Sequence, residues 1–233
     1  MSNIGSARPL VLLTLFSLIW AQPANHPNDM APVKRSQLCV TKGKIETVSG
    51  KHLEVSVPEM RAVLNELTPQ HVEAHFTYLG PSAGEKRLGS GELRRQFGLK
   101  LRAANGCNLV YAMWRIEPKE ELVISVKSNP GMSTHAECGT NGYTNVKAEK
   151  SSPVPRLQKG SSHTMRAKMD KSKLRVWVDQ KLVWEGDVGQ AAMAFDGPVG
   201  IRTDNGRFKF ELFTDQPLSS SSPLPCHAVD EDE

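Results

Sequence analysis

The chain has 233 residues, of which 39% are hydrophobic and 23% are charged, so it is long enough to bury the core of one sizeable domain. Its formal net charge is +4, and the basic residues are spread along the sequence rather than gathered in one block. A charge this small and diffuse argues against nucleic acid as a partner.

The N-terminus has the order of a secretory signal peptide. Arg8 precedes the uncharged apolar run PLVLLTLFSLIWA (9–21), which a polar, proline-containing stretch follows. The run is shorter than the roughly 20 residues of a typical membrane span. We therefore expect residues 1–21 to be cleaved and no stable membrane span to remain, which makes the protein secreted or places it in the periplasm or cell envelope. An uncleaved N-terminal anchor is the alternative. Residues 22–36 are polar and contain prolines, and we expect them to form a disordered lead-in.

The stretch SVPEMRAVLNEL (56–67) fits two structures. Ser56 and Glu59 have the spacing of a capping box, and apolar residues follow at helical spacing. Alternate residues from Met60 onward also align on one face of a strand. Both interpretations stay open at this point.

Most of the sequence that follows alternates with a period of two, which indicates strands. VEAHFTYLG (72–80) places its apolar residues on one face. FGLKLRAANGCNLVYAMWRI (97–116) has two such runs around Asn105-Gly106, the dipeptide typical of a tight type I′ hairpin turn. LVISVK (122–127) is a further strand.

KLRVWVDQKLVWEG (173–186) is a second hairpin signal, with its turn at Asp179-Gln180. The alternation of its first run directs the side chain of Trp177 away from the core, whereas Trp184 lies on the apolar side of the second run. We expect Trp184 to be buried in the core, and we leave open whether Trp177 is exposed or packs under a loop.

The last alternating runs, VGIRT and RFKFELF, flank the turn Asp204-Asn205-Gly206. Beyond them QPLSSSSPLPCHAVDEDE (216–233) is a Ser/Pro-rich tail with an acidic tip, which is not expected to pack. Short strands separated by turns, without βαβ alternation, predict an all-β fold. We expect one antiparallel two-sheet β-sandwich over residues 37–215.

Four cysteines in an exported chain predict disulfides. None of them are spaced C-x-x-C, so zinc binding and thioredoxin-like chemistry are not supported. Of the three pairings, we favour Cys107–Cys138 within the central region and Cys39–Cys226, which would tie the two ends of the domain together. Four free, buried thiols are the alternative.

Two segments resemble the concanavalin A-like jelly rolls. HTMRAKMDKSKLRVWVDQKLVWEG (163–186) is similar to the paired strands of that superfamily, in which L-x-V-x-V-D-G-K-x-V recurs, and GPVGIRTDNGRFKFELF (197–213) is similar to its closing strands. Laminin-G-like modules and the 3-keto-disaccharide hydrolase domain belong to the same group. Gln180 stands where the family usually has glycine, so the turn there must tolerate a side chain. The resemblance implies a jelly roll and makes carbohydrate the leading ligand class.

The residues that could hold a sugar fall in two places. Trp177 offers an aromatic face, and the segment from Trp114 to Asn145 combines an aromatic ring, cations, a carboxylate and amides, which are the groups that bind hydroxyls in pairs. A well-tied loop with a solvated rim is the structural alternative for this segment. The candidate ligand-binding residues are Trp114, Arg115, Lys127, Asn129, His135, Glu137, Tyr143 and Trp177.

No catalytic set is evident in the sequence. Glycoside hydrolysis needs two carboxyl groups roughly 5 to 10 Å apart, and neither the E-x-D-x-x-E string of sandwich glycanases nor a G-x-S-x-G motif occurs. His135 and Glu137 could share one strand face as an acid–base pair or weak metal site, although such a pair is usually structural. No dense cluster of aspartates supports calcium, so no cofactor is expected.

These observations together predict an exported, non-catalytic carbohydrate-binding module for extracellular or cell-envelope polysaccharide. A glycoside hydrolase or lyase is one alternative, and a surface module for structure or protein interaction is the other.

Overall fold

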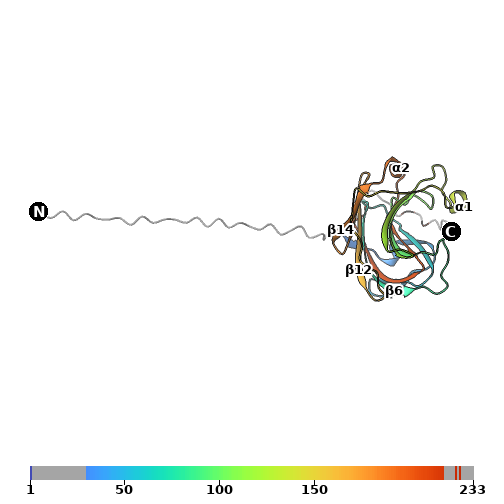
Figure 1. Cartoon of the computed structure of the whole chain (residues 1–233), viewed down its shortest axis with the longest axis horizontal. Coiled ribbons are helices and arrows are strands. Elements are labelled where there is room, and N and C mark those ends of the chain that lie inside the picture. Colours follow the sequence, from blue (N-terminus) through green and yellow to red (C-terminus); the bar gives the residue numbers. More distant parts are fainter. Residues whose placement is uncertain (2–29, 218–223, 225, 227–233) are drawn as a thin grey trace.

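Two antiparallel sheets packed face to face form the body of the protein (Figure 1). The computed structural model describes residues 30–217 together with Met1, Leu224 and Cys226. The expected signal peptide, most of the expected lead-in and most of the tail lie outside the described residues. Among the described residues, no helix is long and apolar enough to cross a membrane.

The nine-stranded sheet has the order β11-β14-β13-β12-β6-β16-β4-β3, with β1 also paired to β16. Its strands are β1 (Ala31–Pro32), β3 (Glu46–Ser49), β4 (His52–Val55), β6 (His71–Pro81), β11 (Lys150–Ser151), β12 (Ser162–Asp170), β13 (Lys173–Val178), β14 (Lys181–Asp187) and β16 (Gly206–Thr214).

The seven-stranded sheet has the order β10-β9-β8-β7-β15-β5-β2. Its strands are β2 (Leu38–Lys42), β5 (Glu59–Leu64), β7 (Arg95–Leu101), β8 (Leu109–Glu117), β9 (Glu121–Lys127), β10 (Tyr143–Asn145) and β15 (Gly200–Asp204). The described helices are single turns: the 3₁₀ turn η1 (Arg35–Gln37), α1 (His135–Cys138) and α2 (Gln190–Met193). The predicted all-β, antiparallel, two-sheet jelly-roll sandwich is confirmed.

The core lies between the sheets and is built from the inward residues of alternating strands. Phe76 on β6 stacks on Phe97 on β7, with ring centroids 4.0 Å apart, and meets Trp114 on β8 edge to face at 5.7 Å. Such aromatic pairs add to the stabilisation that burial alone gives. Trp184 is buried as predicted, and the predicted strand at 72–80 lies within β6.

The ambiguous stretch at 56–67 forms a strand. β5 pairs with β2 on one side and with β15 on the other. A helix here would leave β2 without its partner strand and one edge of β15 unpaired, so the ladder outweighs the local capping signal.

The two predicted hairpins differ in their turns. In β13–β14, Asp179 (φ 48°) and Gln180 (φ 67°) both adopt left-handed backbone angles, the signature of a type I′ turn, so the turn accommodates glutamine in place of glycine. In β7–β8 the predicted tight turn at Asn105-Gly106 is wrong, because the connection runs over residues 102–108. There the Asn105 side chain accepts a hydrogen bond from the backbone N–H of Cys107 at 2.9 Å.

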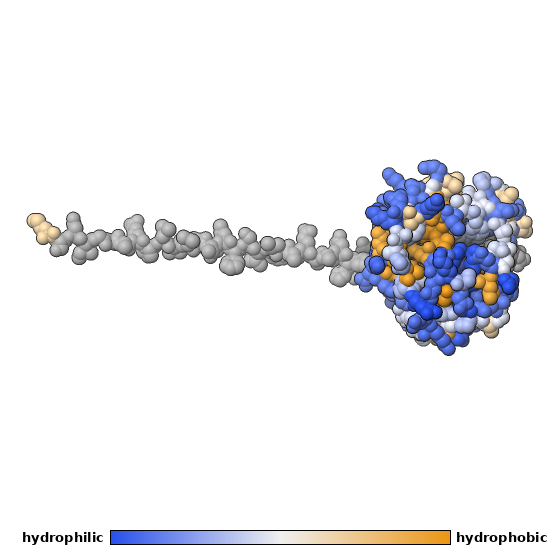
Figure 2. All heavy atoms as spheres, in the orientation of Figure 1, coloured by the Kyte–Doolittle hydropathy of each residue, from blue (hydrophilic) through white to orange (hydrophobic). Residues whose placement is uncertain are grey.

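Both predicted disulfides, Cys107–Cys138 and Cys39–Cys226, are present, with Cα–Cα distances of 5.9 and 5.4 Å. The second bond joins the segment after the last strand to β2. Polar residues cover much of the face seen in Figure 2, interrupted by an apolar area.

Candidate functional site

The outer face of the seven-stranded sheet carries an unusual set of polar side chains, which we call the polar face. Because side chains alternate along a strand, the residues between the core positions of β5, β15, β7, β8, β9 and β10 all point to this face. It consists of Arg61, Gln96, Lys100, Tyr111, Arg115, Ser125, Lys127, Tyr143, Asn145, Arg202 and Asp204. Several of its charged groups are nevertheless buried, including Arg61, Lys100 and Lys127 at 1% exposure each.

Asp204 organises the charges at the middle of the polar face. Its carboxylate is 2.7 Å from the guanidinium of Arg61 and 2.9 Å from that of Arg202, and it accepts a hydrogen bond from the Gln96 amide at 2.5 Å. Burial alone would raise the pKa of Asp204, but the charges of Arg202 and Arg61 and the bond from Gln96 outweigh it and lower the pKa. The carboxylate therefore stays ionised and holds both arginines in place.

A cavity of about 260 Å³ opens on the polar face over β7, β8, β9 and β10. Met113 and Ser125 lie on its floor, Tyr143 and Asn145 on one side and Arg94 on the other. This volume lies just below the roughly 300 Å³ at which small-molecule pockets usually begin.

Two tyrosines form an aromatic wall of this cavity. The rings of Tyr111 and Tyr143 lie nearly parallel, 20° apart in plane, with centroids separated by 6.2 Å. The Lys127 ammonium is 5.1 Å from the centre of the Tyr143 ring, and the Arg202 guanidinium is 5.0 Å from that of Tyr111. Tyr143 is 38% exposed, which makes it the large aromatic residue of the polar face most open to solvent.

The opposite rim is a loop that Asn205 holds against the sheet. Asn205 lies between β15 and β16, where the chain passes from one sheet to the other. Its side chain accepts from the backbone N–H of Lys86 at 2.8 Å and donates to the backbone oxygens of Lys86 and Arg94 at 2.7 and 2.8 Å. These three bonds fix the position of Arg94 at the cavity.

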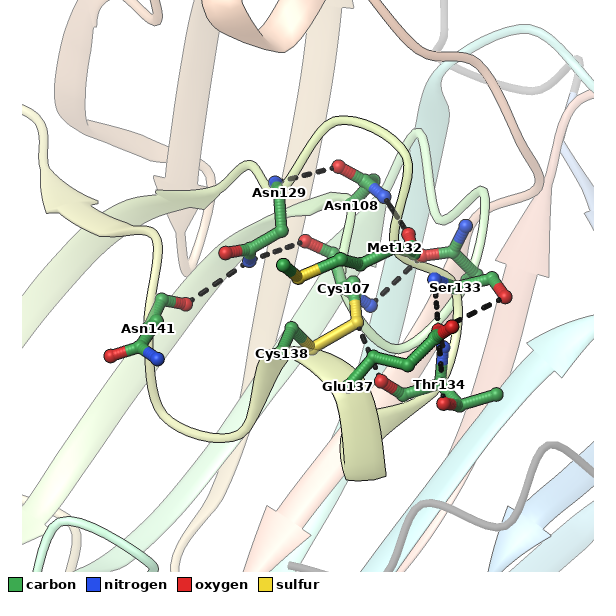
Figure 3. Close-up of a disulfide and its surroundings, with 10 residues drawn as sticks. Cys107, Asn108, Asn129, Met132, Ser133, Thr134, Glu137, Cys138 and Asn141 are labelled. Atoms are coloured by element: carbon green, nitrogen blue, oxygen red, sulfur yellow. Dashed lines mark hydrogen bonds between the residues drawn. A yellow bond between two sulfur atoms is a disulfide. The ribbon is translucent and has the colours of Figure 1, made fainter.

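The loop beside Tyr143 is tied down by a disulfide and by asparagines (Figure 3). The Asn129 side chain donates to the backbone oxygens of Cys107 and Asn141, each at 3.1 Å, and its backbone N–H donates to the Asn108 side chain at 2.8 Å. The Asn108 amide in turn donates to the backbone oxygen of Met132 at 2.8 Å. The disulfide and these hydrogen bonds therefore hold the loop that leads into β10 in place.

Glu137 completes this loop as a helix cap. Its carboxylate accepts from the backbone N–H groups of Ser133 and Thr134 at 2.8 and 2.9 Å and from the Thr134 hydroxyl at 3.0 Å. The backbone bonds from Ser133 and Thr134, followed by the Thr134 hydroxyl, lower its pKa. His135 and Glu137 lie in α1 and not on a strand, so the expectation that they share one strand face is wrong.

The structure separates the predicted site residues into groups. Arg115 and Tyr143 line the cavity and Lys127 lies next to it. Asn129 and Glu137 hold the neighbouring loop in shape. Trp114 is fully buried in the core, where no ligand can reach it, so its assignment to a binding surface is wrong.

Trp177 lies on the outer face of the other sheet. The Arg166 guanidinium covers its ring at 4.4 Å from the centroid, so a sugar stacking on that side would have to displace a cation–π contact. A second, shallower cavity of about 330 Å³ on this sheet is bordered by His75, His163 and Asp179. His163 contacts the Asp179 carboxylate at 2.7 Å, and its other ring nitrogen has no hydrogen-bond partner in the described part of the chain.

Sequence reasoning missed Arg94, Gln96, Tyr111 and Arg202, which line the first cavity. The period-two alternation carried the signal for Tyr111 and Arg202, since each occupies the non-core phase of a predicted strand. Gln96 lies one residue before the predicted strand that starts at Phe97, and β7 begins earlier, at Arg95. Arg94 lies in a loop, and its place depends on Asn205, which is more than a hundred residues away in the sequence. Within the described ranges, no three His, Cys, Asp or Glu side chains come together as metal ligands would.

No protein-family model matches the sequence, and no curated protein matches it significantly. Solved structures of similar fold include the carbohydrate binding module CBM66 from Bacillus subtilis, at 12% identity over 77% of this chain and 92% of that one, with a TM-score of 0.49. The Emp46p carbohydrate recognition domain in its metal-free form matches at 11% identity over 78% and 89% of the two chains, also with a TM-score of 0.49. LamAcat from Zobellia galactanivorans matches at 13% identity over 72% and 79%, with a TM-score of 0.44.

Proposed function

We propose that this protein is an exported, non-catalytic carbohydrate-binding module whose site is the cavity on the polar face. The observation that carries the proposal is the composition of the cavity wall, which holds the exposed ring of Tyr143, the amides of Asn145 and Gln96 and several guanidinium groups. An aromatic face packs against the C–H groups of a pyranose, and planar amides and guanidinium groups bind vicinal hydroxyls in pairs.

The lack of a carboxylate in this wall supports binding without turnover. Hydrolysis of a glycosidic bond needs two carboxyl groups on either side of the scissile bond, and no Asp or Glu is among the described residues that line the cavity. The carboxylate of Asp204 lies beneath the wall, where it is fully buried and paired with Arg61 and Arg202.

Two disulfides support an extracellular setting for this role, because such bonds persist mainly in oxidising compartments. Polysaccharide of the extracellular space or the cell envelope is the partner that this setting offers.

A glycan-array screen of the purified protein, compared with Tyr143→Ala and Trp177→Ala, tests the proposal. We expect specific binding by the parent protein, a loss of at least tenfold in affinity for Tyr143→Ala, and little change for Trp177→Ala, whose ring lies on the opposite sheet. Retained binding in Tyr143→Ala with loss of binding in Trp177→Ala would contradict the assignment of the site to the polar face and would locate it on the nine-stranded sheet. No binding to any glycan by the folded parent protein would contradict the function itself, and release of smaller saccharides from a bound oligosaccharide would contradict its non-catalytic character.

A further inference from the structure

The cavity proposed as the sugar site has three arginines in its wall and no acidic residue among the described residues that line it. Arg94, Arg115 and Arg202 all line it, from a loop, from β8 and from β15. Each faces a carboxylate of the protein: Glu92 for Arg94, Glu121 at 2.9 Å for Arg115 and Asp204 at 2.9 Å for Arg202. None of these carboxylates lines the cavity, so a ligand inside it meets the cations and not their partners.

Arg115 is repelled by the positive charge of Arg94. Burial, followed by the positive charge of Arg94, lowers the pKa of Arg115, and the nearby Glu121 only partly compensates. Its side chain is 17% exposed and that of Arg94 is 22% exposed, so water screens this repulsion only partly. An anion bound between the two guanidinium groups would relieve the repulsion.

Three buried polar atoms of the wall add a more specific requirement. The Nε atoms of Arg94 and Arg115 and the Oε1 atom of Gln96 have no hydrogen-bond partner among the residues that the structure describes. Gln96 is only 2% exposed, and its amide nitrogen is already bonded to Asp204. A complementary ligand would offer acceptors to the two guanidinium groups and a donor to the Gln96 oxygen.

An acidic sugar meets all of these conditions at once. A carboxylate or sulfate accepts from guanidinium groups in a bidentate manner, a ring hydroxyl donates to a carbonyl oxygen, and the C–H face of the ring packs on an aromatic side chain. A free inorganic anion supplies only the first of these contacts, and a neutral sugar offers the guanidinium groups only uncharged hydroxyl acceptors, which form weaker hydrogen bonds than a carboxylate or sulfate.

We propose, resting on the carbohydrate-binding function above, that the ligand of this cavity is an acidic saccharide whose carboxylate or sulfate is held by Arg94 and Arg115 while a hydroxyl of the same ring donates to Gln96. The chemistry of recognition is that of an anionic sugar, and the source of the negative charge, a uronic acid or a sulfate ester, is left to the experiment.

The test uses the purified protein and an array of backbones that are each present in acidic and neutral form: uronates with their methyl esters, and sulfated glycans with their desulfated forms. We expect binding to the acidic member of at least one pair and affinity at least tenfold lower for its neutral partner, which corresponds to about 1.4 kcal/mol. Comparison of uronate pairs with sulfate pairs identifies the charged group. Neutral partners that bind as tightly as the acidic ones would overturn this inference and leave the carbohydrate-binding function standing.

Variants then locate the anion by calorimetry with the best acidic ligand. Arg94→Gln and Arg115→Gln should each lower affinity at least tenfold, and Arg115→Lys, which keeps the charge but loses the bidentate fork, should lie between Arg115→Gln and the parent. Arg166→Gln is the matched control, because it removes an equal charge from the other sheet. Equal losses in Arg166→Gln and Arg94→Gln would overturn the inference by showing only a general charge effect.

Two measurements keep the result decisive. If Arg115→Gln melts before the assay temperature, Arg94→Gln in the exposed loop carries the conclusion. A variant ending at Cys226, which lacks Asp230, Glu231, Asp232 and Glu233, controls for competition by the carboxylates of the chain itself. Binding of inorganic sulfate by the parent protein without binding of any saccharide would refute both this inference and the proposed function.

Discussion

At the scale of single residues, Asp204 has the most demanding position in the protein. Its side chain is completely buried, and it is the shared carboxylate for Arg61 and Arg202 beneath the cavity. A buried charge of this kind is tolerated only because its partners remain in place, and removing one member leaves the others uncompensated in a low-dielectric environment.

We expect Asp204→Asn to lower the free energy of unfolding by about 3 kcal/mol at pH 7, because two buried guanidinium groups lose their counter-charge. Urea denaturation would measure this change, with the exposed Asp170→Asn as the control. Since the folded pKa of Asp204 lies below its ordinary value of about 3.9, its contribution to stability is fully present above that pH and is lost as the pH falls through the folded pKa. The variant should therefore show a shallower loss of stability in acid than the parent protein, and an equally steep loss would contradict this role.

Gln180 lowers the stability of the fold through its backbone conformation. It adopts a φ of 67° in the β13–β14 turn, a conformation that costs a residue with a Cβ about 1 kcal/mol relative to glycine. Because glycine also has more freedom to lose from the unfolded chain, we expect Gln180→Gly to stabilise the protein by about 0.5 kcal/mol. Lys181→Gly, at the adjacent position without a positive φ, should destabilise it instead. Thermal melts of the two variants would show opposite shifts in Tm.

At the scale of elements, the short edge strand β10 depends on the loop that precedes it. β10 pairs with β9 on one side only and supplies Tyr143 and Asn145 to the cavity. The Cys107–Cys138 bond and the asparagine network of Figure 3 join the loop before β10 to the β7–β8 connection. The disulfide therefore serves the aromatic wall of the cavity as well as the stability of the sandwich.

Replacing both Cys107 and Cys138 by alanine should lower the free energy of unfolding by about 3 kcal/mol, because the bond closes a segment with a sequence separation of 31 residues. We also expect weaker ligand binding at temperatures well below the new Tm, since β10 loses its anchor. Calorimetric titration at low temperature separates the two effects. Unchanged affinity in the folded variant would show that β10 keeps its position without the bond.

At the scale of the whole molecule, the fold could be predicted from the sequence because strand alternation and turn residues are local signals. The stretch at 56–67 was ambiguous for the opposite reason, since its conformation depends on ladder partners in β2 and β15. The cavity required more than alternation. Which non-core residues meet depends on the strand order, and β15 places Asp204 opposite Gln96 and Arg202 opposite Gly98 on β7, about a hundred residues earlier in the sequence.

Two polar side chains that could bind a sugar were predicted as ligand-binding residues, although in the fold they hold a loop in place. Asn129 and Glu137 have the amide and carboxylate groups that sugars require, but the structure uses these groups for backbone contacts within their own loop. No local pattern distinguishes an amide that faces a ligand from one that ties a loop. Trp114 was misplaced for a simpler reason, because it occupies the core phase of β8.

The Cys39–Cys226 bond makes most of the chain a covalent ring. It spans a sequence separation of 187 residues, from β2 to beyond the last strand. A single proteolytic cut at any loop between these cysteines therefore cannot release a fragment. We expect protein nicked once within this span to migrate as one band on a denaturing gel without reductant and as two bands with it. Separation of the fragments without reductant would show that the ring is open. With the ring closed, a protease-rich exterior that cuts one loop should leave the molecule covalently in one piece.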